Sequence, residues 1–346
     1  MSELAVHIQN NTGRITLQRP QALNALSMKM CHDIYDALRQ WSEDDDIRQI
    51  IIDAEGEKAF CAGGDVATLH HMGRAGRTDE INAFWREEYR MNSFIAHYPK
   101  PIIALMQGYI MGGGVGIGGH ASHRVVAETS RLAMPECAIG LIPDVGGSHL
   151  LAQAPGHIGE YMGVTGARIG ADDIVYTGFG DYIIDETHWA ELITIICEEN
   201  DLSVLDAMMR PASEQSELRS HQAEINRLFG CADKDQFADL LGQTSTDFAD
   251  KVKEGMSRGS PLSMAAIFPL IRFARTHNSV DRALEYEFRF TSRAIEQADF
   301  LEGVRAVLVD KDHNPDWMHK TVSDVPSDFI DSLFSPTDFH LPPISA

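Results

Sequence analysis

Apolar residues in the first 185 positions follow two alternating patterns. Continuous apolar runs at 50–52 and 102–106 predict buried strands. Elsewhere apolar residues recur about every 3.6 positions, which predicts a helix. One such series follows a capping serine and contains Met30, Ile34, Leu38 and Trp41. Strands that alternate with helices are typical of an α/β domain, which we expect over residues 1–185.

A carboxylate interrupts the apolar stripe of a second predicted helix, which begins near Thr78. The stripe consists of Ile81, Phe84, Met91 and Ile95, and Glu88 lies on it. Charged side chains are rarely buried without a partner. Glu88 therefore either lines a pocket or lies at the exposed margin of the stripe, and the pattern alone leaves both interpretations open.

Beyond residue 185 the pattern becomes mainly helical and acidic. Residues 185–260 contain 16 Asp and Glu against 7 Lys and Arg, which favours a solvated helical surface. Ser260 followed by Pro261 is typical of a helix start. A later helix carries its apolar face on Val280, Leu284, Phe288, Thr291 and Ile295. We expect a second region over residues 186–346.

The charge balance excludes several classes of partner. The 346 residues include 29 Lys and Arg and 51 Asp and Glu, a net charge of −22. Nucleic acids and anionic membranes require a basic face, so neither is an expected partner. The uncharged stretch 101–119 contains seven glycines and predicts a buried strand that enters a turn, because a spanning helix needs about 20 mostly apolar residues.

The cysteines and the N-terminus predict a cytoplasmic protein. Five widely spaced cysteines form no Cys-x-x-Cys pair and are typical of a reducing compartment. The first residues lack the basic and apolar parts of a signal peptide, which favours the cytoplasm, although a matrix protein after removal of its targeting segment would look the same. No metal is expected, since the His120/His123 pair is a weak metal-binding pattern.

A glycine run at 112–119 has two interpretations. Gly114, Gly116 and Gly119 formally match a dinucleotide-binding pattern, although the match lies in mid-chain and has an extra glycine. Alternatively, the run brings backbone N–H groups at a helix start close to a ligand carbonyl, which makes an oxyanion hole. The glycine loop around Gly64 is a candidate for the second donor.

Two carboxylates lie in the otherwise apolar segment 134–144. Glu136 and Asp144 are eight residues apart there. In an apolar setting they either serve acid–base chemistry, with pKa values raised by desolvation, or stay structural, with Glu136 exposed and Asp144 capping a helix. The segment alone does not choose between these interpretations.

Taken together, these segments resemble the enoyl-CoA hydratase/isomerase (crotonase) superfamily. The resemblance covers about residues 6–317. It rests on Asn-Ala-Leu-Ser at 24–27, on 58–65, on Met-Gly-Gly-Gly-Val-Gly at 111–116 and on Met-Pro-Glu at 134–136. Segments 86–89, 138–147 and 302–312 resemble more specifically a thioesterase branch that hydrolyses 3-hydroxyisobutyryl-CoA in valine catabolism. The implied fold is a crotonase-like spiral of ββα units, with the helical C-terminal region packed over the active site.

The resemblance also implies the site and its chemistry. The backbone N–H groups of Gly64 and Gly113 would form the oxyanion hole for an acyl-CoA thioester. Glu88, Gly113, Glu136 and Asp144 would contact the acyl portion, with Glu136 and Asp144 catalytic. Glu136 would attack the carbonyl or activate water, and Asp144 would orient the substrate hydroxyl or the water. No cofactor is implied, since CoA is part of the substrate.

Departures from the superfamily pattern favour hydrolysis. Hydratases carry a second catalytic glutamate where this chain has Gly116, and glycine where it has Asp144. Two alternatives remain, a hydratase/isomerase-type lyase on another acyl-CoA and a non-catalytic protein that binds CoA esters. Lys58, Arg305 and Lys311 are candidates for holding the CoA phosphates or are ordinary surface cations. Superfamily members commonly form trimers or hexamers, so a homo-oligomer is compatible with the resemblance; an acidic insert able to block that packing leaves the oligomeric state open.

Overall fold

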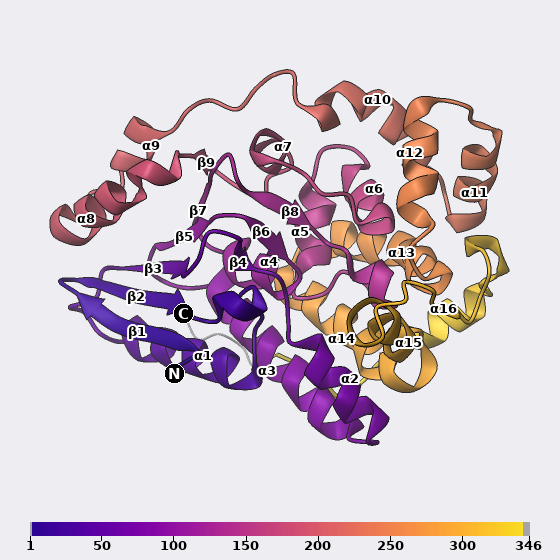
Figure 1. Ribbon diagram of the computed structural model, residues 1–346, viewed down its shortest axis with the longest axis horizontal. Coiled ribbons are helices and arrows are strands. Elements are labelled where there is room, and N and C mark those ends of the chain that lie inside the picture. Colours follow the sequence, from indigo (N-terminus) through magenta and orange to yellow (C-terminus); the bar gives the residue numbers. More distant parts are fainter. Residues whose placement is uncertain (1, 342–346) are drawn as a thin grey trace.

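The computed structural model describes residues 2–341, and its strands form two sheets (Figure 1). The larger sheet has the order β1-β2-β3-β5-β7-β9, with only the β1–β2 pair antiparallel, and the smaller parallel sheet has the order β4-β6-β8. The strands are β1 (Leu4–Gln9), β2 (Thr12–Leu17), β3 (Gln49–Ala54), β4 (Ala59–Cys61), β5 (Ile102–Met106), β6 (Tyr109–Met111), β7 (His123–Val126), β8 (Arg131–Ala133) and β9 (Tyr182–Ile183).

Successive strand pairs create the spiral. The pairs β3–β4, β5–β6 and β7–β8 each add one strand to the larger sheet and the next strand to the smaller sheet. The helices of this half are α1 (Met28–Ser42), α2 (Val66–Arg74), α3 (Thr78–Ala96), α4 (Gly113–Gly118), α5 (Gly147–Gln153), α6 (Ile158–Thr165) and α7 (Ala171–Tyr176). The predicted strands at 50–52 and 102–106, the helix near Thr78 and the ββα spiral are confirmed, whereas α2 is absent from the sequence-based prediction.

The second half of the chain is helical, as predicted. Its helices are α8 (Trp189–Glu199), α9 (Val204–Met208), α10 (Glu217–Phe229), α11 (Lys234–Gln243), α12 (Asp247–Met256), α13 (Pro261–His277), α14 (Val280–Gln297), α15 (Phe300–Val304) and α16 (Ser327–Leu333). A π-helical turn, Arg305–Val309, continues α15. Ser260 caps α13 by accepting a hydrogen bond from the N–H of Ser263, and Pro261 is its first residue.

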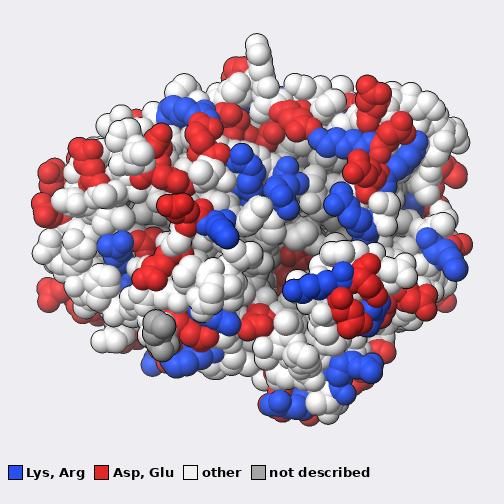
Figure 2. Space-filling model, in the orientation of Figure 1, with Lys and Arg blue, Asp and Glu red and all other residues white. Residues whose placement is uncertain are grey.

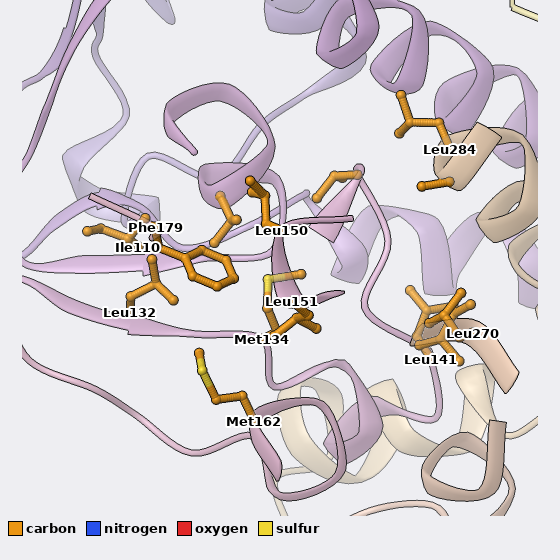
Figure 3. Packing of buried hydrophobic residues seen from close by; sticks show 14 of the residues in the cluster. Ile110, Leu132, Met134, Leu141, Leu150, Leu151, Met162, Phe179, Leu270 and Leu284 are labelled. Atoms are coloured by element: carbon orange, nitrogen blue, oxygen red, sulfur yellow. The ribbon is translucent and has the colours of Figure 1, made fainter. Parts of the chain in front are cut away.

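The larger sheet is covered on both faces. Because side chains alternate along a strand, Ile50 and Ile52 of β3 enter the main core, whereas Ile51 packs with α8 and α9 on the other face. Figure 3 shows that the main core combines strand residues such as Ile110 with Leu284 of α14. Helices α10 to α12 bury apolar residues in the same core. The solvated helical surface predicted for 185–260 is present, and each helix there also has an apolar face that packs in a core.

None of the helices in residues 2–341 has the length and apolar character that crossing a bilayer requires. The division of the chain at residue 185 stays a prediction.

Candidate active site

Two glycine turns lie side by side at the ends of β4 and β6. Gly63 has φ +113° and Gly112 has φ +47°, backbone conformations that residues other than glycine rarely adopt. A Cβ added to Gly63 would lie 3.9 Å from the backbone nitrogen of Gly113. Within residues 2–341, the N–H groups of Gly64 and Gly113 donate no hydrogen bond. Two neighbouring backbone donors are thus available to one acceptor.

The remaining glycines of the run serve close packing. Gly113–Gly118 forms α4, so Gly114 and Gly116 lie inside the helix and Gly119 directly follows it. A dinucleotide-binding pattern instead has its glycines in the turn that opens the helix. A Cβ on Gly114 would lie 2.2 Å from the carbonyl oxygen of Cys61, and one on Gly119 would lie 2.7 Å from that of Val115. The dinucleotide interpretation is therefore wrong, because these glycines allow backbones to approach each other.

All five predicted site residues line one cavity of about 200 Å³. They are Gly64, Glu88, Gly113, Glu136 and Asp144. Glu88 is 2% exposed, and Glu136 and Asp144 are each 5% exposed. A marginal Glu88 and an exposed Glu136 are therefore wrong. A capping Asp144 is wrong as well, because α5 has Gly146 as its N-cap and no side chain caps it. The catalytic and binding roles of these residues stay predictions.

The carboxylates border the glycine turns. A Cβ on Gly113 would lie 2.7 Å from Oε1 of Glu88, and one on Gly112 would lie 3.0 Å from Oε1 of Glu136. Among the described residues, Oε1 of Glu88 and Oε2 of Glu136 have no hydrogen-bond partner. Buried polar atoms usually have partners, so these two oxygens are available to a bound molecule.

Burial raises the pKa values of all three carboxyl groups, and the charge of Asp144 adds to the shift of Glu88 and Glu136. Desolvation, followed by the charge of Asp144, raises the pKa of Glu88 well above its usual range, and the same two causes act on Glu136. Desolvation raises the pKa of Asp144 to about 6, although the hydroxyl of Tyr89 opposes the shift by donating a hydrogen bond of 2.7 Å to Oδ2. The cavity therefore retains protons near neutral pH.

Sequence reasoning missed Tyr89 and the apolar lining of the cavity. Trp85 and Leu141 line it, together with Val307 and Leu308 of the π-helical turn. Trp85 directly precedes the matched segment 86–89, and Tyr89 is its last residue. Val307 and Leu308 lie within the matched segment 302–312, so these two segments were the available signal. Only tertiary packing brings the two segments to one cavity.

Basic side chains lie near a hollow on the surface, although the molecule as a whole is strongly acidic. Figure 2 shows Lys and Arg side chains around a hollow near the centre of the face it draws, in a molecule of net charge −22. Of the predicted phosphate-binding cations, Arg305 is occupied by ion pairs with Glu302, Asp310 and Asp312. Lys58 and Lys311 are exposed.

An adjoining cavity of about 460 Å³ shares three lining residues with the first. They are Met111, Pro135 and Ala138. Its charged lining is balanced, with Arg168, Lys251 and Arg258 against Asp173, Glu217 and Glu254. The larger volume alone therefore does not identify a phosphate site. Among the described residues, no group of three His, Cys, Asp or Glu side chains is arranged to hold a metal ion.

Residues 12–334 match the family model described as enoyl-CoA hydratase/isomerase. The chain is 36% identical over 345 residues to "3-hydroxyisobutyryl-CoA hydrolase, mitochondrial" of Gallus gallus, covering 97% of this chain and 89% of that protein. It is 33% identical to the Homo sapiens protein of the same name, covering 96% of this chain and 88% of that one.

Two solved structures resemble the chain over nearly its full length. One is titled an enoyl-CoA hydratase from Rhodobacter sphaeroides 2.4.1, with a TM-score of 0.92, 46% identity and coverage of 97% of this chain and 98% of that one. The other is titled a carnitinyl-CoA dehydratase from Mycobacterium thermoresistibile, with a TM-score of 0.93, 31% identity and 99% coverage of each chain. The relatives thus agree on fold and differ in the reactions that their names state.

Proposed function

This chain belongs to the enoyl-CoA hydratase/isomerase family, and from that premise we propose that it hydrolyses 3-hydroxyisobutyryl-CoA to 3-hydroxyisobutyrate and CoA. The proposal takes its substrate from the names of the animal relatives. Membership of the family supports an acyl-CoA substrate, but a shared fold hosts many reactions. The choice of reaction must therefore come from the cavity itself.

The surroundings of Gly116 carry the proposal. A Cβ at this position would lie 2.6 Å from Nδ2 of Asn92 and 2.9 Å from Cβ of Val145. The place where hydratases are expected to carry a second glutamate is thus filled by neighbouring side chains. The additional carboxylate of this chain, Asp144, lies in the cavity instead. This exchange disfavours addition of water to a double bond and favours a reaction at the thioester carbonyl.

The proposed reaction uses the backbone N–H groups of the glycine turns and the buried carboxyl groups of the cavity. The N–H groups of Gly64 and Gly113 donate to the thioester oxygen and stabilise the negative charge that develops on it. Glu136 then attacks the carbonyl carbon in its ionised form, whose population rises with pH because burial raises the pKa of this carboxyl group. The C–S bond breaks, and CoA leaves as the thiolate, which takes a proton; water hydrolyses the resulting mixed anhydride and restores Glu136. In the alternative, Glu136 removes a proton from the water that attacks. Asp144 orients the substrate hydroxyl or that water.

A parallel assay tests the reaction class. Purified protein is given 3-hydroxyisobutyryl-CoA or crotonyl-CoA, and free thiol and loss of the enoyl absorbance are both recorded. We expect thiol release from the hydroxy ester alone. Hydration of crotonyl-CoA without thiol release would contradict the proposal and support a lyase, the reaction class that the titles of the two similar structures state. Binding of CoA esters without turnover would support the non-catalytic alternative.

Partners and compartment form part of the proposal. We expect an acyl-CoA as the small-molecule partner and no nucleic acid or membrane. Cytoplasm remains the predicted compartment, whereas the animal relatives are named as mitochondrial proteins. The oligomeric state, which the superfamily resemblance leaves open, is tested by light scattering of the purified protein.

A further inference from the structure

A fourth buried carboxylate lies behind the cavity, outside its lining. Glu287 of α14 is 0% exposed. Its Oε2 accepts a hydrogen bond of 2.8 Å from the N–H of Gly146, and its Oε1 accepts one of 3.0 Å from the N–H of Ser148. The hydroxyl of Ser148 also donates to Oε1. All three donors belong to the short segment that directly follows Asp144.

This segment has a backbone that needs such support. Val145 has φ +56°, a left-handed conformation that is unfavourable for a β-branched residue, and Gly146 follows with φ +75°. Strain of this kind persists only where surrounding contacts determine the conformation. His120 supplies one contact, since its Nε2 lies 2.9 Å from the carbonyl oxygen of Val145. Glu287 supplies the others on the following residues.

The same helix also supports the side chain of Asp144. Thr291 lies one helical turn after Glu287, on the same face of α14. Its Oγ1 is 3.3 Å from the hydroxyl oxygen of Tyr89, which in turn donates to Asp144. Helix α14 thus contacts the backbone after Asp144 directly, and the carboxyl group of Asp144 through Tyr89.

We propose that Glu287 is a positioning residue that fixes the turn carrying Asp144, while Thr291 acts through Tyr89 to set the direction of the Asp144 carboxyl group. This role rests on the proposed function, because it matters for turnover only if Asp144 acts on the substrate. An apolar side chain at this position would leave the N–H groups of Gly146 and Ser148 without their acceptor, so the turn requires an acceptor here even though burying a carboxylate is unfavourable. Desolvation indeed raises the pKa of Glu287 to about 8, against the effect of its hydrogen-bond donors.

The substitution Glu287→Gln tests the role with little change in shape. In either orientation, the amide sets its NH₂ group against a backbone N–H of Gly146 or Ser148, so one hydrogen bond is replaced by a repulsive contact. We expect kcat to fall by about 10²-fold, the cost of a misplaced catalytic group. The matched control is Glu296→Gln, which makes the same change at an exposed position of the same helix and should retain wild-type kcat.

A double substitution separates positioning from general damage. If Glu287 acts only through Asp144, Asp144→Asn combined with Glu287→Gln is no slower than Asp144→Asn alone, because the group to be positioned is already missing. Multiplied losses would overturn the proposal. The assay uses thiol release from 3-hydroxyisobutyryl-CoA, or hydration of crotonyl-CoA if the wild type catalyses that reaction instead, so failure of the proposed function is visible in the wild type.

A crystal structure of Glu287→Gln gives a readout that does not depend on activity. We expect the turn at Val145 to relax and the 2.7 Å bond between Tyr89 and Asp144 to be lost. An unchanged turn with Asp144 in place would contradict the proposal. Should Glu287→Gln fail to fold, Ser148→Ala removes one donor and leaves both backbone N–H groups; a several-fold loss of kcat that vanishes in the Asp144→Asn background is then expected, and a loss that persists there overturns the proposal.

Discussion

The two walls of the cavity are built in different ways. The oxyanion wall consists of backbone N–H groups in the turns after β4 and β6, which neighbour each other in one sheet. The acidic wall consists of the side chains of Glu88 and Asp144, and their supports extend to Glu287 on α14, 143 residues after Asp144. Backbone donors need only a local turn, whereas buried acids need partners from distant parts of the chain.

The walls also differ in their electrostatic cost. The N–H groups of the oxyanion wall present fixed dipoles that need no counter-charge. The carboxyl groups of the acidic wall are buried together, and each ionised group disfavours ionisation of the next. The difference predicts that changes in the first wall alter mainly catalysis, whereas changes in the second alter catalysis and stability together.

Removal of the nucleophile or base gives the largest expected effect. Glu136→Gln keeps the size of the side chain and removes its ability to ionise, so we expect kcat for thiol release to fall by about 10³-fold or more. Circular dichroism checks that the fold is retained. Glu128→Gln, at an exposed position, is the matched control. Turnover near the wild-type rate would contradict the role of Glu136.

Replacing one acid of the acidic wall by its neutral amide should raise the free energy of unfolding. The pKa of Asp144 is raised to about 6 in the native state and is about 3.9 in an unfolded chain. Native Asp144 therefore destabilises the fold as pH rises from about 4 to 6, and the full penalty, about 3 kcal/mol, is present above 6. Asp144→Asn, measured by urea unfolding, should be more stable than wild type at pH 7.5 by up to about this amount and equal to it near pH 4.

A control of opposite sign sharpens this test. The hydrogen bond with Arg210 lowers the pKa of Asp172, so ionised Asp172 stabilises the native state. Asp172→Asn should therefore be less stable than wild type at pH 7.5, and the difference should shrink as pH falls below the usual range of the carboxyl group. The same sign for both variants would show that the cavity imposes no special cost on Asp144.

A methyl group on the oxyanion wall tests how closely the walls fit. Gly113→Ala keeps the N–H but places Cβ 2.7 Å from Oε1 of Glu88 and 3.0 Å from Cδ1 of Leu26. One wall must move, and we expect kcat to fall by about 10²-fold. Gly242→Ala, where an added Cβ meets no atom within 4 Å, is the control. An unchanged kcat would show that the walls tolerate independent movement.

The smallest expected effect comes from removing one hydroxyl group. Tyr89→Phe leaves the ring in the core and deletes the hydrogen bond to Asp144. We expect about a tenfold loss of kcat, and an upward shift of the Asp144 pKa, because the lost donor stabilises the ionised form. The pH dependence of kcat measures that shift. Tyr35→Phe, on α1, is the control, and a downward shift would contradict the role of Tyr89.

Much of the fold and the positions of the five cavity residues were predictable from the sequence. Continuous apolar runs in the sequence predict the buried strands, and the glycine turns follow these strands at a short distance. The residue types at 88, 136 and 144 indicated chemistry because carboxylates are unusual among apolar neighbours. Helix α2 was missed because it is only nine residues long and buries just two of them, Leu69 and His70.

The sequence by itself determined the elements, the glycine turns and which carboxylates are unusual, since these depend on spacing along the chain. Tertiary structure alone decided which side chains meet. Glu287 lies beside Phe288 in a helix whose pattern predicts only a buried face, and nothing local pairs it with Gly146. The reason is physical: a buried carboxylate is defined by the donors around it, and those donors come from elements that only folding brings together.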